Sequence, residues 1–373
     1  MNETEYLNAI NTLISLCKCA VNRTTPEKTT YSTDELDCLY LVAKKHMLTS
    51  LVGTILKELK IENDKFVKSV AAAQSREVLY DNEYKQIIAE LEKNRIWYMP
   101  LKGAVLKDLY PVFATREMCD RDILFDEKRA QDVKNIMVEL GFQVKSYGKY
   151  KDDNYVKSPY LSFEMHRLMI GDRHKTEIYE YYRNVRSRLL RDDDNAYGYH
   201  LSKEDFYVFM IAHEYKHYNM GGTGLRSLLD TYIYLKNNSL DMDYVESEIR
   251  KLDIEKYEKA NRMLSLKLFS GSELSESEKE MLDYILSSGA YGVLEHDVRN
   301  QIEKRGGRLR YIFKRLFGPR KDDKEWPFFR DRYALFYRYK ILLPFLPAYR
   351  LMRALFKSPK RLAREIRAMF KKG

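Results

Sequence analysis

Strand and helix signals alternate in one short segment of a chain whose remaining sequence is dominated by helical periodicity. WYMPLKG (97–103), MCDRDILF (118–125) and YLSFEMH (160–166) are short apolar runs of the kind that form strands. The amphipathic stretch DEKRAQDVKNIMVELG (126–141) lies between the second and the third run and ends at glycine, as helices often do. This alternation over about 70 residues predicts a small sheet packed with helices.

Helical periodicity continues on both sides of this segment. Apolar residues recur at helical spacing in residues 3–22 and 64–94 before it, and in residues 204–217 and 224–237 after it. We therefore predict an α+β fold, in which a small mixed-sheet core is flanked by N-terminal and C-terminal helical segments. Four parts are expected: an N-terminal helical segment (1–94), the sheet core (95–170), a helical domain (171–303) and a basic, aromatic-rich helical tail (304–373).

The basic charge of the chain is concentrated in that tail. The 65 Lys and Arg against 55 Asp and Glu give a net charge of +10, yet residues 304–373 alone hold 22 basic and 5 acidic residues. The tail therefore carries +17, and residues 1–303 carry −7. This distribution excludes a protein that is basic throughout and wraps nucleic acid, and it predicts a mildly acidic body with a basic appendage.

Hydropathy and cysteine usage bear on the compartment. The mean hydropathy is −0.54, and no run of about 18 uncharged apolar residues occurs, so no integral membrane segment is expected. The opening MNETEYLNAI lacks the basic and apolar regions of a secretory signal, and the chain has four cysteines. We expect a cytoplasmic protein whose cysteines are buried apolar residues rather than disulfides.

Two aspartates in the strand MCDRDILF give the strongest chemical signal. Asp120 and Asp122 are two positions apart, so on a strand both side chains project to the same side. Two such carboxylates can hold a hard cation such as Mg²⁺, and Glu164 in the third strand is the candidate for a third acid. Gly103 lies at a predicted strand-to-helix turn where backbone can approach a phosphate, and Lys102 adds a cation. Metal, phosphate cradle and cation are the parts of a phosphoryl or nucleotidyl transfer site.

The order of these motifs resembles a known family. LKG, LYP, Arg116, D-x-D-I-L, a helix ending in LGF and a strand with an acid and H-R-L are similar to the bacterial "uncharacterised nucleotidyltransferase" family of the DNA polymerase β-like superfamily. The resemblance is best over residues 99–168 and covers most of 95–356 more loosely. It implies a nucleotidyltransferase that transfers an NMP from an NTP to an unidentified hydroxyl acceptor, with Mg²⁺ as cofactor and release of pyrophosphate.

The resemblance also implies a role for each residue of the site. Asp120 and Asp122 would bind the catalytic Mg²⁺ ions, and Glu164 would be the third acid, able to help activate the acceptor. The residues expected near the nucleotide phosphates are Lys102, Gly103 and Arg116.

Two positions depart from the pattern of the superfamily. Ala104 follows the turn glycine where Ser or Gly is usual, so no hydroxyl is available there to bond a phosphate. Arg121 stands between the two aspartates where an apolar residue is usual. Its side chain should point to the opposite face, which indicates either an edge strand or an ion pair with an acid.

Other interpretations stay open from the sequence alone. HEYKH (213–217) matches the zinc-protease pattern H-E-x-x-H, and His166 fits either a structural role or a role near the acceptor. The alternatives to NMP transfer are a catalytically silent scaffold with this fold, which binds a membrane or a partner through the tail, and a toxin-like enzyme that modifies tRNA. The tail suits peripheral membrane contact, RNA contact or a folded cap on the body.

Overall fold

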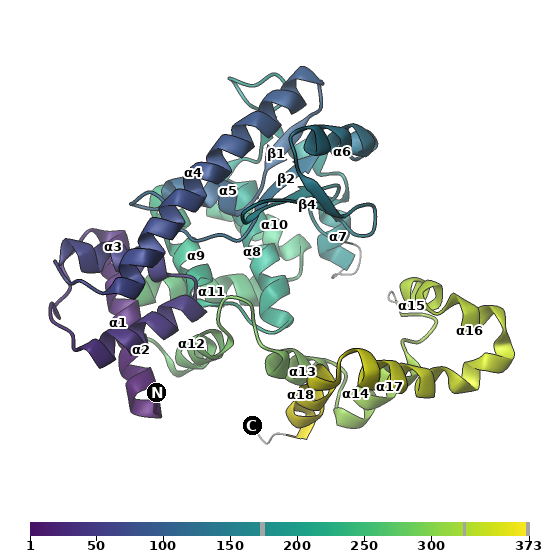
Figure 1. The fold of residues 1–373 in the computed structure, drawn as a ribbon. Coiled ribbons are helices and arrows are strands. Elements are labelled where there is room, and N and C mark those ends of the chain that lie inside the picture. Colours follow the sequence, from purple (N-terminus) through teal and green to yellow (C-terminus); the bar gives the residue numbers. More distant parts are fainter. Residues whose placement is uncertain (172–175, 324–325, 371–373) are drawn as a thin grey trace. The chain divides into compact units, whose positions relative to one another are not determined.

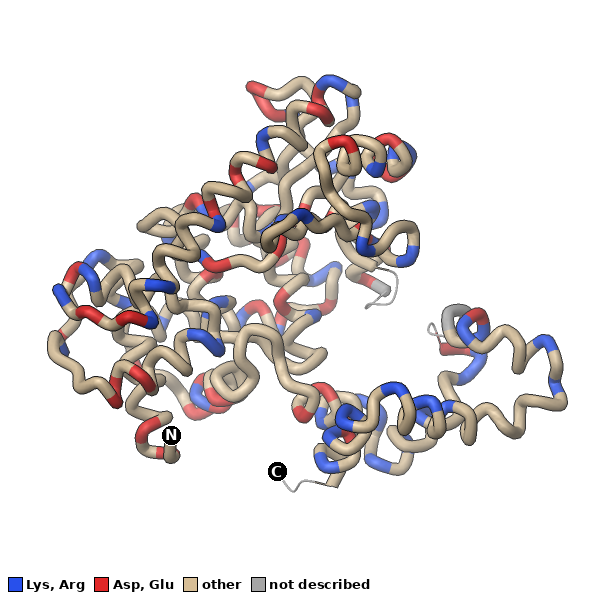
Figure 2. Tube along the Cα trace, viewed as in Figure 1, with Lys and Arg blue, Asp and Glu red and all other residues tan. Residues whose placement is uncertain are grey.

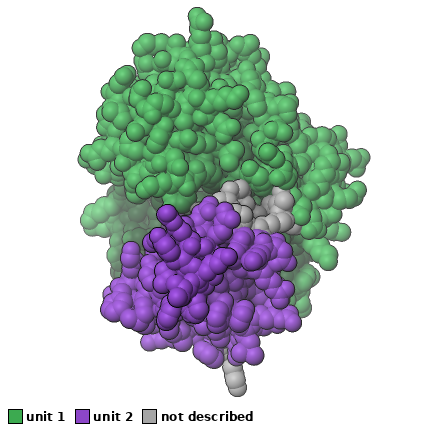
Figure 3. Space-filling view, turned by 90° about the vertical axis from the view of Figure 1, so that its right-hand side faces the viewer, with its two compact units in different colours: residues 1–215, 224–286 green, residues 216–223, 287–373 purple. Residues whose placement is uncertain are grey.

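The computed structural model describes residues 1–171, 176–323 and 326–370, and its contacts divide the chain into two compact units. Unit 1 comprises residues 1–215 and 224–286, and unit 2 comprises the described residues of 216–223 and 287–373 (Figure 3). The segment 171–303, expected as one helical domain, contributes to both units. The four-part division of the sequence stays a prediction.

Unit 1 begins with helices whose starts are set by side-chain caps. Asn2 and Glu5 form a reciprocal capping box at the first helix, and Ser32 and Glu35 form another at the second. The helices are α1 (Glu3–Asn22), α2 (Thr33–Lys45), α3 (Thr49–Glu58) and α4 (Asp64–Lys93), of which the long α4 runs beside the sheet (Figure 1). The helices expected over 3–22 and 64–94 are thus confirmed.

The four cysteines form no disulfide. Cys17 and Cys19 are buried in α1, as predicted, and Cys38 is half-buried. Cys119 is exposed, so the prediction of a buried residue is wrong there. The reason is that Cys119 lies in the bend before the site strand rather than in the strand itself.

The sheet has a mixed topology that places the two site strands side by side. Its order is β1-β2-β5-β4-β3, with β2 and β5 parallel and the other neighbours antiparallel. The strands are β1 (Tyr98–Pro100), β2 (Arg121–Phe125), β3 (Gln143–Ser146), β4 (Asp152–Lys157) and β5 (Leu161–His166). Between them lie α5 (Gly103–Leu106), η1 (Lys107–Leu109), η2 (Glu127–Arg129) and α6 (Ala130–Glu139). A small mixed sheet in a mostly helical chain confirms the α+β class.

The two faces of the sheet differ because side chains alternate along each strand. One face is buried against α4 and α6, and its apolar residues include Ile123, Phe125, Tyr155, Phe163 and Met165. The positions between them give the other face a row of polar side chains, namely Asp122, Asn154, Glu164 and His166. The apolar face fixes the register of the strands, and that register brings the polar row together.

Strand β4 comes from a segment in which the sequence analysis predicts no strand. Its sequence DDNYVK carries Asp and Asn, which are depleted in strands. It forms because it pairs with β5 on one side and β3 on the other, and because Tyr155 is buried in the core. Its Asn154 lies opposite Glu164, so β4 supplies part of the polar face.

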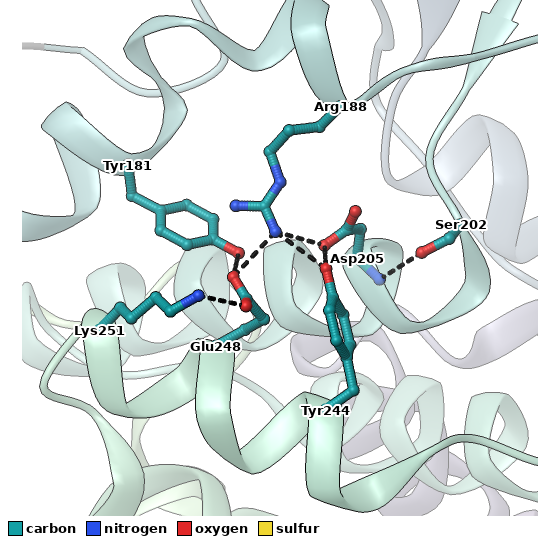
Figure 4. Close-up of polar contacts among 7 residues, drawn as sticks. All are labelled: Tyr181, Arg188, Ser202, Asp205, Tyr244, Glu248 and Lys251. Carbon is teal, nitrogen blue, oxygen red and sulfur yellow. Dashed lines mark hydrogen bonds and ion pairs between the residues drawn. The ribbon is translucent and has the colours of Figure 1, made fainter.

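The rest of unit 1 is a helical layer joined by a polar network around Arg188. The elements are α7 (Thr176–Arg183), η3 (Val185–Arg188), β6 (Leu190–Arg191), β7 (Tyr199–His200), α8 (Lys203–Asn219), α9 (Leu225–Asn237), α10 (Met242–Lys251), α11 (Glu255–Ser270) and α12 (Glu276–Ser288), of which the last residues of α8 and α12 belong to unit 2. Arg188 Nη2 donates to Asp205 at 2.8 Å and to Glu248 at 2.9 Å, and Tyr181 and Tyr244 hydrogen bond to the same carboxylates (Figure 4). This network ties η3 to α8 and α10 and is satisfied internally.

Unit 2 consists of helices in its described residues. They are α13 (Leu294–Lys304), α14 (Arg308–Phe317), α15 (Trp326–Arg332), α16 (Ala334–Arg338), η4 (Lys340–Phe345), α17 (Leu346–Lys357) and α18 (Pro359–Phe370). Glu365 of α18 is buried, accepts from Tyr311 Oη at 2.8 Å and pairs with Arg315 Nε at 2.6 Å, both from α14. Among the described helices, none combines the length and the apolar character needed to span a membrane.

Candidate active site

Both carboxylate oxygens of Asp122 in β2 are engaged. Oδ2 accepts a hydrogen bond from Lys102 Nζ at 2.9 Å, and Oδ1 lies 2.9 Å from His166 Nε2. The residue is 7% exposed. Burial alone would raise the pKa of its carboxyl, but Lys102 and His166 hold that pKa well below its usual range. Asp122 is therefore ionised at neutral pH, with positive charge already beside it.

Glu164 of β5 faces Asp122 across the parallel strand pair. The two residues are register partners, so their side chains lie on the same face. Glu164 Oε1 accepts from Asn154 Nδ2 at 3.3 Å, and Oε2 lies 3.5 Å from His166 Nε2, a contact that lowers the pKa of Glu164. In the described part of the chain, the group with metal-ligand spacing is Asp122, Glu164 and His166, whose ligand atoms lie within 4.8 Å of one another.

The hydrogen bonds of His166 decide what its imidazole can do. The ring is fully buried, and Lys151 Nζ lies 3.0 Å from its Nδ1. Because an ammonium group can only donate, Nδ1 accepts, and Nε2 carries the proton that is donated to Asp122. A protonated Nε2 has no lone pair for a metal. His166 therefore orients Asp122, and the carboxylates remain as metal ligands.

Asp120 adds a third carboxylate next to this pair. Strand β2 begins at Arg121, so Asp120 lies immediately before the strand instead of within it. Burial, together with the charges of Asp122 and Glu164, raises the pKa of Asp120 to about 6. Crowding three carboxylates is unfavourable unless a cation is present, and an all-oxygen donor set is the kind that Mg²⁺ prefers. The carboxylates on this face of the sheet thus suit a hard divalent cation.

The turn after β1 directs Lys102 at the carboxylates. Lys102 takes a positive φ of 44°, and Gly103 begins α5 directly after it. A Cβ on Gly103 would clash with Met118 and would lie 2.6 Å from Arg116 Nη1, so a larger residue here would require both side chains to move. Burial alone would lower the pKa of Lys102, but Asp122 and then Asp120 and Glu164 raise it. The ammonium group therefore stays charged.

Arg116 is held by an acid from a distant helix. Its Nε and Nη2 each donate to one oxygen of Asp230 in α9 at 2.8 Å, and Tyr110 Oη donates to the same carboxylate at 2.8 Å. Arg116 and Asp230 are both buried, and the pair is the bidentate kind that fixes a guanidinium in one orientation. The remaining Nη1 is turned toward Gly103. The fixed orientation of Arg116 therefore sets how closely its side chain approaches the turn.

Comparison with known proteins identifies the family of this chain. The family described as uncharacterised nucleotidyltransferase matches residues 32–270, which is more than half of the chain. The chain belongs to this nucleotidyltransferase family. The match includes every predicted site residue and the whole five-stranded sheet, so the suspected family and enzyme class are confirmed. The chain has no match among curated proteins and none among solved structures.

Arg121 of the nucleotidyltransferase points away from the site and is paired. It is 2% exposed, contacts Glu77 and lies 3.2 Å from Asp81 of α4, with its guanidinium over the ring of Tyr80. Strand β2 lies between β1 and β5, so of the two explanations offered by the sequence the ion pair holds and the edge strand does not. The pair attaches α4 to the strand that carries Asp122.

The HEYKH segment of the nucleotidyltransferase lies at the end of α8. Its Glu214 is buried, and burial followed by the charge of Asp230 raises its pKa well above the usual range. Glu214 accepts from Thr231 Oγ1 at 3.4 Å and from Asn261 Nδ2 at 3.3 Å. Within the described residues, the group with metal-ligand spacing is Asp122, Glu164 and His166, and neither His213 nor His217 belongs to it. A buried Glu214 whose carboxylate is bonded to Thr231 and Asn261 does not suit the general base of a zinc protease.

Two residues of the site carry no sequence signal that singles them out. Lys151 and Asn154 belong to the unpredicted β4 region, so nothing placed them beside His166 and Glu164. Asp230 is a third residue that was not placed at the site, because its partner Arg116 lies 114 residues earlier in the chain.

Proposed function

We propose that this nucleotidyltransferase moves an NMP from an NTP to a hydroxyl group of its acceptor in a Mg²⁺-dependent reaction. The observation that carries the proposal is the cluster of Asp122 and Glu164 on the polar face of the sheet, with Asp120 just before β2 and Lys102 Nζ 2.9 Å from Asp122. Asp120 and Asp122 would hold the metal, and Glu164 would complete the acidic site. Bound Mg²⁺ would neutralise the triphosphate and stabilise the departing pyrophosphate.

The residues around the carboxylates have separate tasks in this proposal. His166 keeps Asp122 in one rotamer through its Nε2 proton, so Asp122 needs no reorganisation when a cation binds. Lys102 balances Asp122 until then, and its flexible stem lets the ammonium turn to a phosphate afterwards. Glu164, whose pKa is lowered, is ionised and can accept the proton of the acceptor hydroxyl.

The triphosphate is proposed to lie along the turn at Gly103. Support comes from Lys102 and from Arg116 Nη1, which is turned toward Gly103 while its other nitrogens bind Asp230. Ala104 contributes no hydroxyl, so phosphate contacts on this side depend on the backbone and on these two cations. We also propose a cytoplasmic location, because the reaction consumes nucleoside triphosphates.

The test is a screen for NMP transfer. Full-length protein is incubated with Mg²⁺ and each NTP in a cell lysate, and acceptors are identified by the mass of one added NMP. The proposal expects such an adduct for at least one NTP and its loss in the Asp120→Ala/Asp122→Ala variant. An adduct that forms equally well with the double variant would contradict the assignment of the site, and no adduct with any NTP would favour a catalytically silent scaffold.

A further inference from the structure

Exposed apolar side chains are concentrated in the last part of unit 2. Of the 32 large hydrophobic residues that are exposed in the described part of the chain, 15 lie between residues 309 and 370. The most exposed include Leu309 at 84%, Ile341 at 81% and Phe356 at 78%. A folded soluble unit of this size does not normally leave so many large apolar side chains in water. This surface therefore needs a partner.

The exposed residues follow the faces of helices. In α14, Leu309, Phe313 and Phe317 recur at four-residue spacing, and the last two rings stack at 4.5 Å. In α17, Met352 and Phe356 share a face at the same spacing. The opposite side of α14 carries Tyr311, which is buried against Glu365 of α18. The helices are thus anchored to one another on one side and present apolar rows on the other.

Cationic side chains flank these apolar rows. Residues 304–373 carry +17, and Figure 2 shows Lys and Arg predominating over Asp and Glu along α14, α17 and α18. On α18, Lys360, Arg364 and Arg367 share the face next to exposed Ile366 and Phe370. Lys357, Lys360 and Arg367 are exposed and belong to no ion pair among the described residues. An apolar row with solvated cations beside it is the pattern of a helix that lies in a bilayer interface.

We propose that unit 2 docks on an anionic lipid bilayer through the outward faces of α14, α17 and α18. Apolar side chains such as Phe356 and Ile366 enter the region between headgroups and acyl chains, and the neighbouring Lys and Arg side chains contact lipid phosphates. Both signals are needed, because either a few apolar residues or a basic patch alone gives weak and reversible attachment. Since no described helix can span a membrane, the protein lies on the surface.

The character of the surface favours lipid over other partners. Single-stranded RNA would stack its bases on aromatic rings, but many of the exposed residues are aliphatic, such as Leu309, Ile341, Leu355 and Ile366. A second copy of the chain would bring one +17 tail against another, which opposes self-association. A bilayer with anionic headgroups satisfies the apolar rows and the positive charge together.

Flotation of full-length protein with vesicles tests the proposal. One vesicle type is phosphatidylcholine alone, and the other contains equal parts of phosphatidylcholine and phosphatidylglycerol. We expect the protein to float with the anionic vesicles only, and the bound fraction to fall as NaCl shortens the Debye length. The variant Phe356→Ser/Ile366→Ser removes apolar area, and Lys357→Gln/Lys360→Gln/Arg367→Gln removes charge; each should weaken binding by about tenfold or more.

Matched controls separate this effect from a general loss of folding. Leu41 and Val67 are each 57% exposed in unit 1, so Leu41→Ser/Val67→Ser should float as the unchanged protein does. Thermal melting of every variant should match the unchanged protein, because only exposed side chains are altered. The proposal is overturned by absence of binding to anionic vesicles, by equal binding to neutral ones, or by apolar variants that bind normally. It is also overturned if RNA, an acidic protein or a second copy binds these faces while vesicles do not.

Discussion

Lys102 Nζ and Asp122 Oδ2 lie 2.9 Å apart at the centre of the candidate site. An ammonium group therefore sits beside the carboxylate on which the proposed Mg²⁺ depends. His166 already occupies Oδ1 of this carboxylate, so Lys102 and a metal ion would compete for Oδ2. Removing the lysine should therefore change the affinity of the site for the metal in a direction that can be measured.

Lys102→Met should raise the affinity for Mg²⁺ several-fold and lower the affinity for NTP. The first effect follows because no ammonium then competes for Asp122, and the second because a proposed phosphate contact is lost. Calorimetric titration with Mg²⁺ alone, and then with a non-hydrolysable NTP at saturating Mg²⁺, measures both. Lys128→Met, at an exposed position after β2, is the control and should change neither affinity. Weaker Mg²⁺ binding in the Lys102 variant would contradict the competition.

His166→Gln and His166→Asn should differ in transfer activity. A glutamine amide reaches the position of Nε2 and can still donate to Asp122, whereas the shorter asparagine cannot. A hydrogen bond to a charged group contributes about 1.5–3 kcal/mol, so the transfer rate of His166→Asn should fall about tenfold or more. His166→Gln should keep most of the activity. Steady-state kcat and KM of both variants are the measurement, and equal losses in the two would rule out the proposed role of the Nε2 proton.

The buried pair of Arg116 and Asp230 should contribute more to stability than an exposed pair. Arg116→Ala leaves a buried carboxylate without its partner, so the free energy of unfolding should fall by about 3–5 kcal/mol. Arg129→Ala breaks the exposed pair with Asp132 and should cost less than about 1 kcal/mol. Urea unfolding measures both. The double variant Arg116→Met/Asp230→Leu should lose less free energy of unfolding than the single variants Arg116→Met and Asp230→Leu lose in sum. Strict additivity would contradict the coupling.

The stability of the fold should fall with acidity through His46. The ring is fully buried, and its Nδ1 accepts the N–H of Leu225 at 3.1 Å. Burial, then the charge of Lys45, lowers the pKa of His46 from 6.5 to about 3. Because the unfolded chain takes up this proton first, stability is fully present above about pH 6.5 and falls between pH 6.5 and about pH 3, by about 1.4 kcal/mol per pH unit. Urea unfolding at stepped pH should show a shallower slope for His46→Asn, and an unchanged slope would contradict the assignment.

Local pattern was enough to predict the strands that carry the carboxylates. Asp122 comes directly before the apolar run ILF and Glu164 sits in an alternating strand, so both strands follow from the local pattern, whereas Asp120 lies outside β2. The register that sets Asp122 opposite Glu164 was not visible, because it depends on how β2 and β5 pair across about 40 residues of chain. The strands of Asp122 and Glu164 were therefore predictable, although their pairing was not.

Contacts distant in sequence supplied what pattern could not. Strand β4 forms from a sequence with weak strand propensity, because its two neighbours and Tyr155 outweigh the local preference. Arg121 breaks the expected apolar pattern of its strand, but Glu77 and Asp81 of α4 compensate for its burial. Tertiary partners of this kind also fix Arg116 on Asp230 and His166 on Lys151, which a single sequence does not reveal.

Binding of a non-hydrolysable NTP with and without Mg²⁺ tests the central claim most directly. Calorimetry on the full-length protein should show binding with Mg²⁺ and little or none when EDTA removes the metal. Asp120→Asn/Asp122→Asn should abolish the Mg²⁺-dependent binding, whereas Asp132→Asn, an exposed carboxylate on α6, should leave it intact. Equal affinity with Mg²⁺ and with EDTA, or unchanged affinity in the double variant, would show that these carboxylates do not form a nucleotide-binding metal site.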